Sequence, residues 1–151
     1  MPALIAPVVV ILVVLLLVAG IRRGADIGVR IDGDKLVIDI RGADIVLALC
    51  RRIVVPVSQV KGVAVSDLAD VPRQGMRLPG TSWPGVIRAG SYGTGDARSF
   101  WDVRKGPQVL WIEFEPGFAY QRAILEVSDP HARLLELRPT LGAWVPTDYL
   151  I

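Results

Sequence analysis

The feature that most constrains this chain is its N-terminus, because residues 1–21 contain no Asp, Glu, Lys, Arg or His. Residues 4–21 read LIAPVVVILVVLLLVAGI. At a rise of about 1.5 Å per residue, a helix of this length reaches about 27 Å, close to the thickness of a hydrocarbon core. Pro7 falls in the first turn, where a missing N–H is tolerated. We therefore expect residues 1–21 to be a transmembrane anchor that contacts the lipid bilayer through residues 4–21.

Two other interpretations of this segment fit less well. A cleaved signal peptide needs a basic start and a small-x-small cleavage site, whereas Val18-Ala19-Gly20 is followed here by Ile-Arg-Arg. A uniformly apolar helix buried in the core does not suit so small a domain. Basic residues beside a span favour the cytoplasmic side, so Arg22 and Arg23 as the anchor's flank predict an outside N-terminus and a cytoplasmic domain. The single cysteine agrees with a reducing compartment.

The charged residues all lie beyond Gly20, where 17 basic and 15 acidic residues leave a net charge of +2. Such a small surplus gives no reason to expect a nucleic-acid partner. About 130 residues follow the anchor, which is enough for one domain with a hydrophobic core. We expect a juxtamembrane linker at residues 22–26, a domain at residues 27–142 and a C-terminal tail at residues 143–151.

Short alternating segments predict a domain that is mainly β. A hairpin is expected over residues 27–40, turning at Asp32-Gly33-Asp34. Residues 71–83, rich in Pro and Gly, are expected to be the longest loop, with at most a short strand at 76–78. One helix is expected after Ser128 or Asp129, and Pro139 is expected to end or kink it. Further strands are expected at residues 45–50, 53–57, 60–65, 86–92, 100–103, 109–115 and 120–127.

The residues that could carry chemistry favour structural roles. Cys50 lies in an apolar run and is expected to be a buried or half-buried hydrophobe, since no histidine stands near it to activate a thiolate. His131 is the only histidine, which excludes a His/Cys zinc cluster. A triad of His131 with Ser128 and Asp129 lacks a nucleophile-elbow pattern. We therefore predict no catalytic residue and no enzyme activity.

Acidic and glycine-rich stretches also lack the spacing of known sites. The aspartates at positions 26, 32, 34 and 39 do not form an EF-hand, so solvated turn carboxylates are the simpler interpretation. Glu113 and Glu115 are expected on the wet face of a sheet. Residues 90–95 hold three glycines but no phosphate-binding motif, and a hairpin turn is expected there. We therefore predict no cofactor and no metal.

The tryptophans leave two interpretations open. Trp83, Trp101, Trp111 and Trp144 either pack in the core and its rim, or line a half-exposed groove or membrane-contacting surface with nearby arginines. The arginines concerned are Arg73, Arg77 and Arg88.

Several stretches together resemble a known family. After the helix and its Arg-Arg end come RLPGTSWPGVIRAGSYG (77–93), VLWIEFE (109–115), YQRAILEVS (120–128) and DPHARLLEL (129–137). This order resembles the pleckstrin-homology (PH) superfold, and in particular the bacterial PH-like domains that follow an N-terminal membrane helix. The resemblance implies a strongly bent antiparallel sheet, or partly open barrel, of about seven strands capped by a C-terminal helix. The resemblance does not imply catalysis. It does not imply phosphoinositide binding either, because the lipid-binding members have basic residues in the first hairpin loop, which is acidic here.

These observations together predict a membrane-anchored PH-like interaction or scaffold module on the cytoplasmic face. We expect it to bind a protein partner at or in the membrane through Arg73, Arg77, Trp83 and Arg88, and the tether would let weak contacts suffice. The alternative is a small-ligand or lipid-binding β-domain, including an extracytoplasmic one. It requires an apolar pocket that stays open under residues 131–137 of the C-terminal helix.

Overall fold

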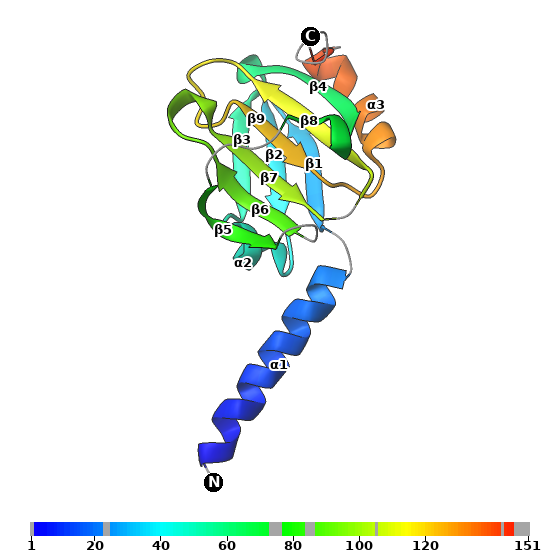
Figure 1. Ribbon diagram of the computed structural model, residues 1–151. Helices are drawn as coiled ribbons and strands as arrows, with labels where there is room; N and C mark the ends of the chain where they lie inside the picture. The colour runs from blue at the N-terminus through cyan, green and yellow to red at the C-terminus, as the bar shows by residue number, and fades with distance from the viewer. Residues whose placement is uncertain are drawn as a thin grey trace.

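A computed structural model describes residues 2–22, 25–72, 77–83, 87–104, 106–142 and 144–146 of the chain. Helix α1 (Pro2–Arg22) projects away from a domain made of two β-sheets, and helix α3 (Pro130–Leu141) packs on the domain near the C-terminus (Figure 1). The fold is thus mainly β with a C-terminal helix, as the alternating segments predict.

Helix α1 is continuous over 21 residues, with Pro7 inside it. Its large apolar side chains that are described are exposed, from Val18 at 41% to Leu16 at 64%. The structure describes the side chains of this helix only at residues 6–16, 18 and 19. Among the residues so described, no helix is both long enough and apolar enough to cross a membrane.

The first sheet is antiparallel and contains β1 (Ile27–Asp32), β2 (Lys35–Ile40) and β3 (Arg52–Pro56) in that order. The β1–β2 hairpin confirms the prediction for residues 27–40, and Gly33 in its turn has a φ of 61°. Such positive values favour glycine, which has no Cβ.

The chain between β2 and β3 corrects the prediction of a strand at residues 45–50, because residues Asp44–Ala48 form helix α2. Asp44, Leu47 and Ala48 are buried while Val46 is 63% exposed, so burial follows the helical spacing of three to four residues. A short apolar run cannot be assigned to a helix or a strand by its periodicity. The packing of Leu47 into the core decides in favour of the helix.

The second sheet contains six strands in the order β4-β8-β9-β7-β6-β5. Neighbouring strands are antiparallel except β7 and β9, which are parallel. In the described part of the chain the sheets hold nine strands, so the expectation of about seven, all antiparallel, is wrong. The strands are β4 (Val60–Asp67), β5 (Arg77–Trp83), β6 (Ile87–Tyr92), β7 (Ser99–Val103), β8 (Gln108–Phe114) and β9 (Arg122–Leu125).

Strand β5 occupies much of the segment expected to be a loop. It pairs only with β6, so it forms an edge of the second sheet. The pairing register shifts between Arg77 and Gly80. Pro79 lies within this irregularity, which is where a residue without an N–H is tolerated in a strand. Pro79 and Gly80, two of the residues that suggested a loop, therefore belong to an irregular edge strand.

Helix α3 begins as predicted, with Asp129 as its N-cap, whose carboxylate accepts a hydrogen bond from the Ala132 amide at 2.9 Å. Leu137 and Leu141 are buried in the core between the sheets. The sequence predicts that Pro139 ends or kinks the helix; it lies inside the helix, which continues to Leu141, so it does not end it.

The domain has a hydrophobic cluster on each face of the second sheet. The larger cluster joins both sheets, α2 and α3, and includes Leu36, Phe100 and Leu137. The smaller cluster lies on the opposite face and contains Trp101 and Trp111, which are 1% and 0% exposed. For these two indoles the core interpretation is confirmed.

Glu113 shares the face of Trp111 and corrects another expectation, because its side chain is buried rather than solvated. The Trp111 indole N–H donates to its carboxylate at 2.8 Å. Trp144 covers this face: its ring lies 5.6 Å from that of Trp111, and a Cβ at Gly62 would come within 2.1 Å of the Trp144 Cβ. The C-terminal segment at Trp144 thus helps to cover this face beside β4.

Candidate functional site

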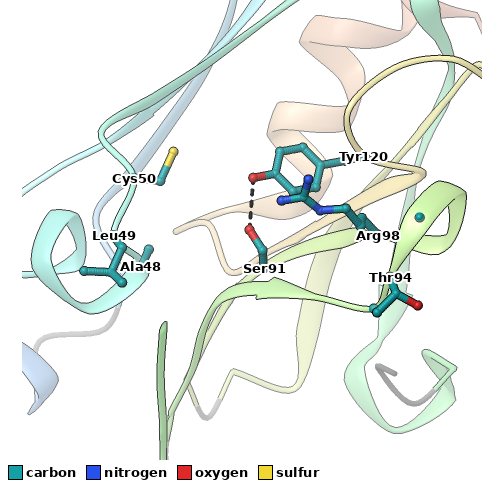
Figure 2. Close-up of a pocket in the computed structure, with 9 residues that line it drawn as sticks. Ala48, Leu49, Cys50, Ser91, Thr94, Arg98 and Tyr120 are labelled. Carbon is teal, nitrogen blue, oxygen red and sulfur yellow. Dashed lines mark hydrogen bonds between the residues drawn. The ribbon is translucent and has the colours of Figure 1, made fainter. Parts of the chain in front are cut away.

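A cavity with a volume of about 610 Å³ opens between helix α2 and the β6–β7 end of the second sheet (Figure 2). One wall is Ala48, Leu49 and Cys50, at the end of α2. The opposite wall is formed by side chains of the second sheet and its connections, namely Ser91, Thr94, Arg98 and Tyr120, with Gly93 and Gly95.

A tight turn positions the polar wall. Gly93 has a φ of 84°, and a Cβ there would come within 2.3 Å of the Ala97 carbonyl oxygen, so only glycine fits. The chain then forms a short 3-10 turn (Gly95–Ala97) and delivers Arg98 to the cavity. The amide of Gln121 donates to the Arg98 carbonyl at 2.7 Å, which holds Arg98 beside Tyr120.

A hydrogen-bonded pair of hydroxyls and one cation lie on this wall, which also includes Thr94. The Ser91 Oγ and the Tyr120 hydroxyl lie 3.0 Å apart and share a hydrogen bond (Figure 2). The Arg98 guanidinium lies 5.5 Å from the centre of the Tyr120 ring, within the range of a cation–π contact. Its side chain forms no ion pair within the described part of the chain, and no acidic residue lines the cavity.

The apolar wall contains an unusual residue. Leu49 follows α2 with a φ of 53°, in the left-handed region, and it is 65% exposed. Among the described residues it is the only non-glycine residue with a positive φ. A bulky side chain in this conformation is a genuine outlier, because its Cβ crowds the neighbouring backbone.

Cys50 lies next to it and is half-buried, as predicted. Burial raises the pKa of its thiol, an effect that the hydrogen bond with the Arg52 backbone opposes in part and the charge of Asp102 reinforces. The thiol therefore stays protonated at neutral pH and contributes apolar surface to the cavity wall rather than a nucleophile.

A buried ion pair holds α2 beside the second sheet. The Arg104 guanidinium, just after β7, donates to the Asp44 carboxylate at the start of α2, and the two side chains are 4% and 2% exposed. Asp44 also accepts a hydrogen bond from the Asp26 amide at 2.8 Å. Burial lowers the pKa of Arg104, and the charge of Glu126 opposes this effect. The pair thereby fixes the position of the cavity's apolar wall.

Asp102 is fully buried on β7 and has no hydrogen-bond partner among the described residues. Burial raises the pKa of its carboxyl to about 7, and the charge of Glu126 adds to the effect. The sequence of β7 does not show that this aspartate is buried. Alternation along a strand tells which residues share a face of the sheet, but not whether another element packs over that face.

Of the residues predicted to bind a partner, only Arg88 has a described side chain, and it does not line this cavity. Arg88 on β6 is half-buried, with its guanidinium 5.9 Å from the centre of the Trp101 ring. Arg88 and Ser91 are three residues apart on this strand. Because side chains alternate along a strand, the two side chains lie on opposite faces of the sheet. Arg77 and Trp83 are the ends of β5, whose side chains are not described. Arg73, Arg23 and the Arg22 side chain lie outside the described residues.

Reasoning from the sequence missed the cavity. The predicted location was under residues 131–137, yet none of three cavities among the described residues is lined by them. Leu49, Ser91, Arg98 and Tyr120 come from four separate segments, and only the glycine turn beside Arg98 gave a local signal. The described residues contain no group of three side chains suited to hold a metal ion.

Comparison with known proteins finds no match, since no family model, no curated protein and no solved structure is significantly similar to this chain.

Proposed function

We propose that the protein is a membrane-anchored, non-enzymatic interaction module that binds a protein partner. The observation that carries this proposal is helix α1, whose 21 residues extend about 32 Å while apolar side chains such as Ile11 and Leu12 stay 59% and 58% exposed. Leaving one such side chain in water costs roughly 1.5–3 kcal/mol relative to full burial. A lipid bilayer of about 30 Å is a matching environment for the whole helix.

The Arg22-Arg23 pair at the end of the helix supports a cytoplasmic domain. Strands followed by one C-terminal helix that packs into the core support a PH-like domain. The parallel β7–β9 pair is a departure from an all-antiparallel sheet.

The contact surface that we propose is the edge strand β5 with Arg88 of the neighbouring strand. An edge strand offers backbone groups that a partner segment can pair with, and Arg77 and Trp83 lie at its two ends. The anchor would raise the local concentration of a partner in the same membrane, so a weak contact would be enough.

Placement is tested by cysteine labelling in intact cells, using Cys50→Ser with Asp96→Cys, an exposed position. We expect the new thiol to resist a membrane-impermeant reagent until the cells are lysed, while Ala3→Cys in the same background labels at once. Labelling of the Asp96→Cys thiol in intact cells would reverse the topology. Release of the protein by alkaline carbonate would contradict the anchor.

Partner binding is tested with a photo-crosslinking residue in place of Thr81, in the middle of β5. We expect an adduct of one defined mass, which disappears when Arg73, Arg77, Trp83 and Arg88 are replaced by alanine. The matched control is Arg133→Ala, which removes an arginine from α3 and should leave the adduct intact. An adduct that survives the fourfold substitution would show that this surface is not the contact.

A further inference from the structure

We propose that the cavity between α2 and the second sheet binds a small amphipathic carboxylate. The carboxylate would lie against Arg98, and the apolar body against Ala48 and Leu49. This ligand site is separate from the partner surface on β5, so either proposal can fail without the other. The volume of about 610 Å³ lies within the range of cavities that hold small organic ligands.

The first argument is the unbalanced charge of the cavity. Arg98 is its only charged lining residue, and the guanidinium forms no ion pair among the described residues. Contact with the Tyr120 ring orients the guanidinium beside the cavity. A cation held in place without a counter-charge is suited to bind an anion, because charge-assisted hydrogen bonds are stronger than neutral ones.

The second argument is the pair of hydroxyls next to this cation. Ser91 and Tyr120 share one hydrogen bond of 3.0 Å, and either oxygen can be the donor. The two hydroxyls have two hydrogens, and the bond between them uses one. The other hydrogen is available to an acceptor in the cavity. An anion beside Arg98 could therefore accept a hydrogen bond from one of these hydroxyls as well as interact with the positive charge of the guanidinium.

The number of charges selects a carboxylate over a phosphate. A single guanidinium neutralises one negative charge, and its planar fork matches the two oxygens of a carboxylate. A phosphate monoester carries between one and two charges at neutral pH. No second basic residue lines the cavity to balance the excess.

Leu49 supplies the argument for an apolar body. It combines two unfavourable features, a left-handed backbone with a φ of 53° and a side chain that is 65% exposed. Glycine at this position would remove both, since it adopts positive φ without strain. Strained residues of this kind gather at ligand sites. With Ala48 and the protonated Cys50 thiol, the Leu49 side chain provides an apolar wall opposite the cation.

The test titrates 3-phenylpropionate into the full chain in lipid nanodiscs by calorimetry, with empty nanodiscs as the baseline. Two probes of the same shape replace the carboxylate with a hydroxyl or a phosphate. We expect the carboxylate to bind at least about tenfold more tightly than the alcohol, as for a hydrogen bond to a charged group. Equal binding of the alcohol, tighter binding of the phosphate, or no binding of the carboxylate at millimolar concentration would each overturn the proposal.

Two variants assign the binding to the named residues. We expect Arg98→Gln to weaken binding of 3-phenylpropionate about tenfold. We expect Leu49→Gly also to weaken it, while the unfolding temperature stays equal or rises because the backbone strain is removed. The matched controls are Arg133→Gln and Leu135→Ala, both on α3 and remote from the cavity lining, which should leave affinity unchanged. Unchanged affinity in a folded Arg98→Gln or in Leu49→Gly would refute the assignment.

Discussion

At the scale of single residues, Asp102 is a carboxyl group that is fully buried in the domain. It faces the core between the sheets, beside its strand partners Ala89 and Leu125, with Glu126 close enough to raise its pKa. Its pKa of about 7 in the folded state lies above the ordinary value of 3.8. Between these two values the folded state holds a proton that the unfolded state has lost, so stability falls as pH rises.

We therefore predict that the free energy of unfolding declines between about pH 4 and pH 7 and levels off above pH 7. The rise in the pKa of Asp102 corresponds to a total change in the free energy of unfolding on the order of 4 kcal/mol. Asp102→Asn should remove this decline and be more stable than the wild type at pH 8, with a difference that shrinks as the pH falls and is small below about pH 4. Unfolding followed by the fluorescence of the buried tryptophans would measure it.

Asp39 provides an internal check on the sign of this effect. Its hydrogen bond from Arg52, with a further contribution from Arg30, lowers the pKa of its carboxyl. This group loses stability as pH falls through the acid range, in the opposite direction to Asp102. Because both proteins keep Asp39, the difference between wild type and Asp102→Asn isolates Asp102. An equal slope in both would contradict the assignment.

At the scale of elements, helix α2 depends on one buried ion pair for its position. It has five residues, too few to be stable alone, so tertiary contacts must hold it. Asp44 at its start binds Arg104 beyond β7, and Leu47 enters the core. The cavity's apolar wall follows directly from the end of this helix.

We predict that Asp44→Ala lowers the free energy of unfolding by about 3–5 kcal/mol, because it leaves the Arg104 charge buried without its partner. The double variant Asp44→Ala with Arg104→Met should lose less than the sum of the single variants. The matched control is the exposed Arg133–Glu136 pair on α3, where Glu136→Ala should cost at most about 0.5 kcal/mol. Additive losses at Asp44 and Arg104 would contradict the coupling.

At the scale of the whole molecule, helix α1 and the domain differ in where their apolar side chains lie. Clusters on both faces of the second sheet bury the large apolar side chains of the domain, whereas the described apolar side chains of α1 stay exposed away from the sheets (Figure 1). Both proposed sites, at β5 and at the cavity, belong to the domain. The energetic role of α1 in our proposal is then to confine these sites to a surface, which multiplies the effect of weak binding.

The sequence alone determined the elements whose signals are local. The charge-free N-terminus forms helix α1, the Asp-Gly turn forms the β1–β2 hairpin, and Asp129 with Pro130 starts α3. Each of these depends on hydrogen bonds or side-chain spacing within a few residues, and such information is present in a short stretch of chain.

Tertiary structure alone decided the features that depend on what covers a residue. Helix α2 and the parallel β7–β9 pair arise from contacts between distant segments, which periodicity does not encode. The burial of Asp102 and Glu113 depends on the elements that pack over the second sheet. The cavity is a further case. Leu49 and Arg98 line it from segments far apart in the sequence, so an apolar wall faces a cation only after folding brings the two segments together.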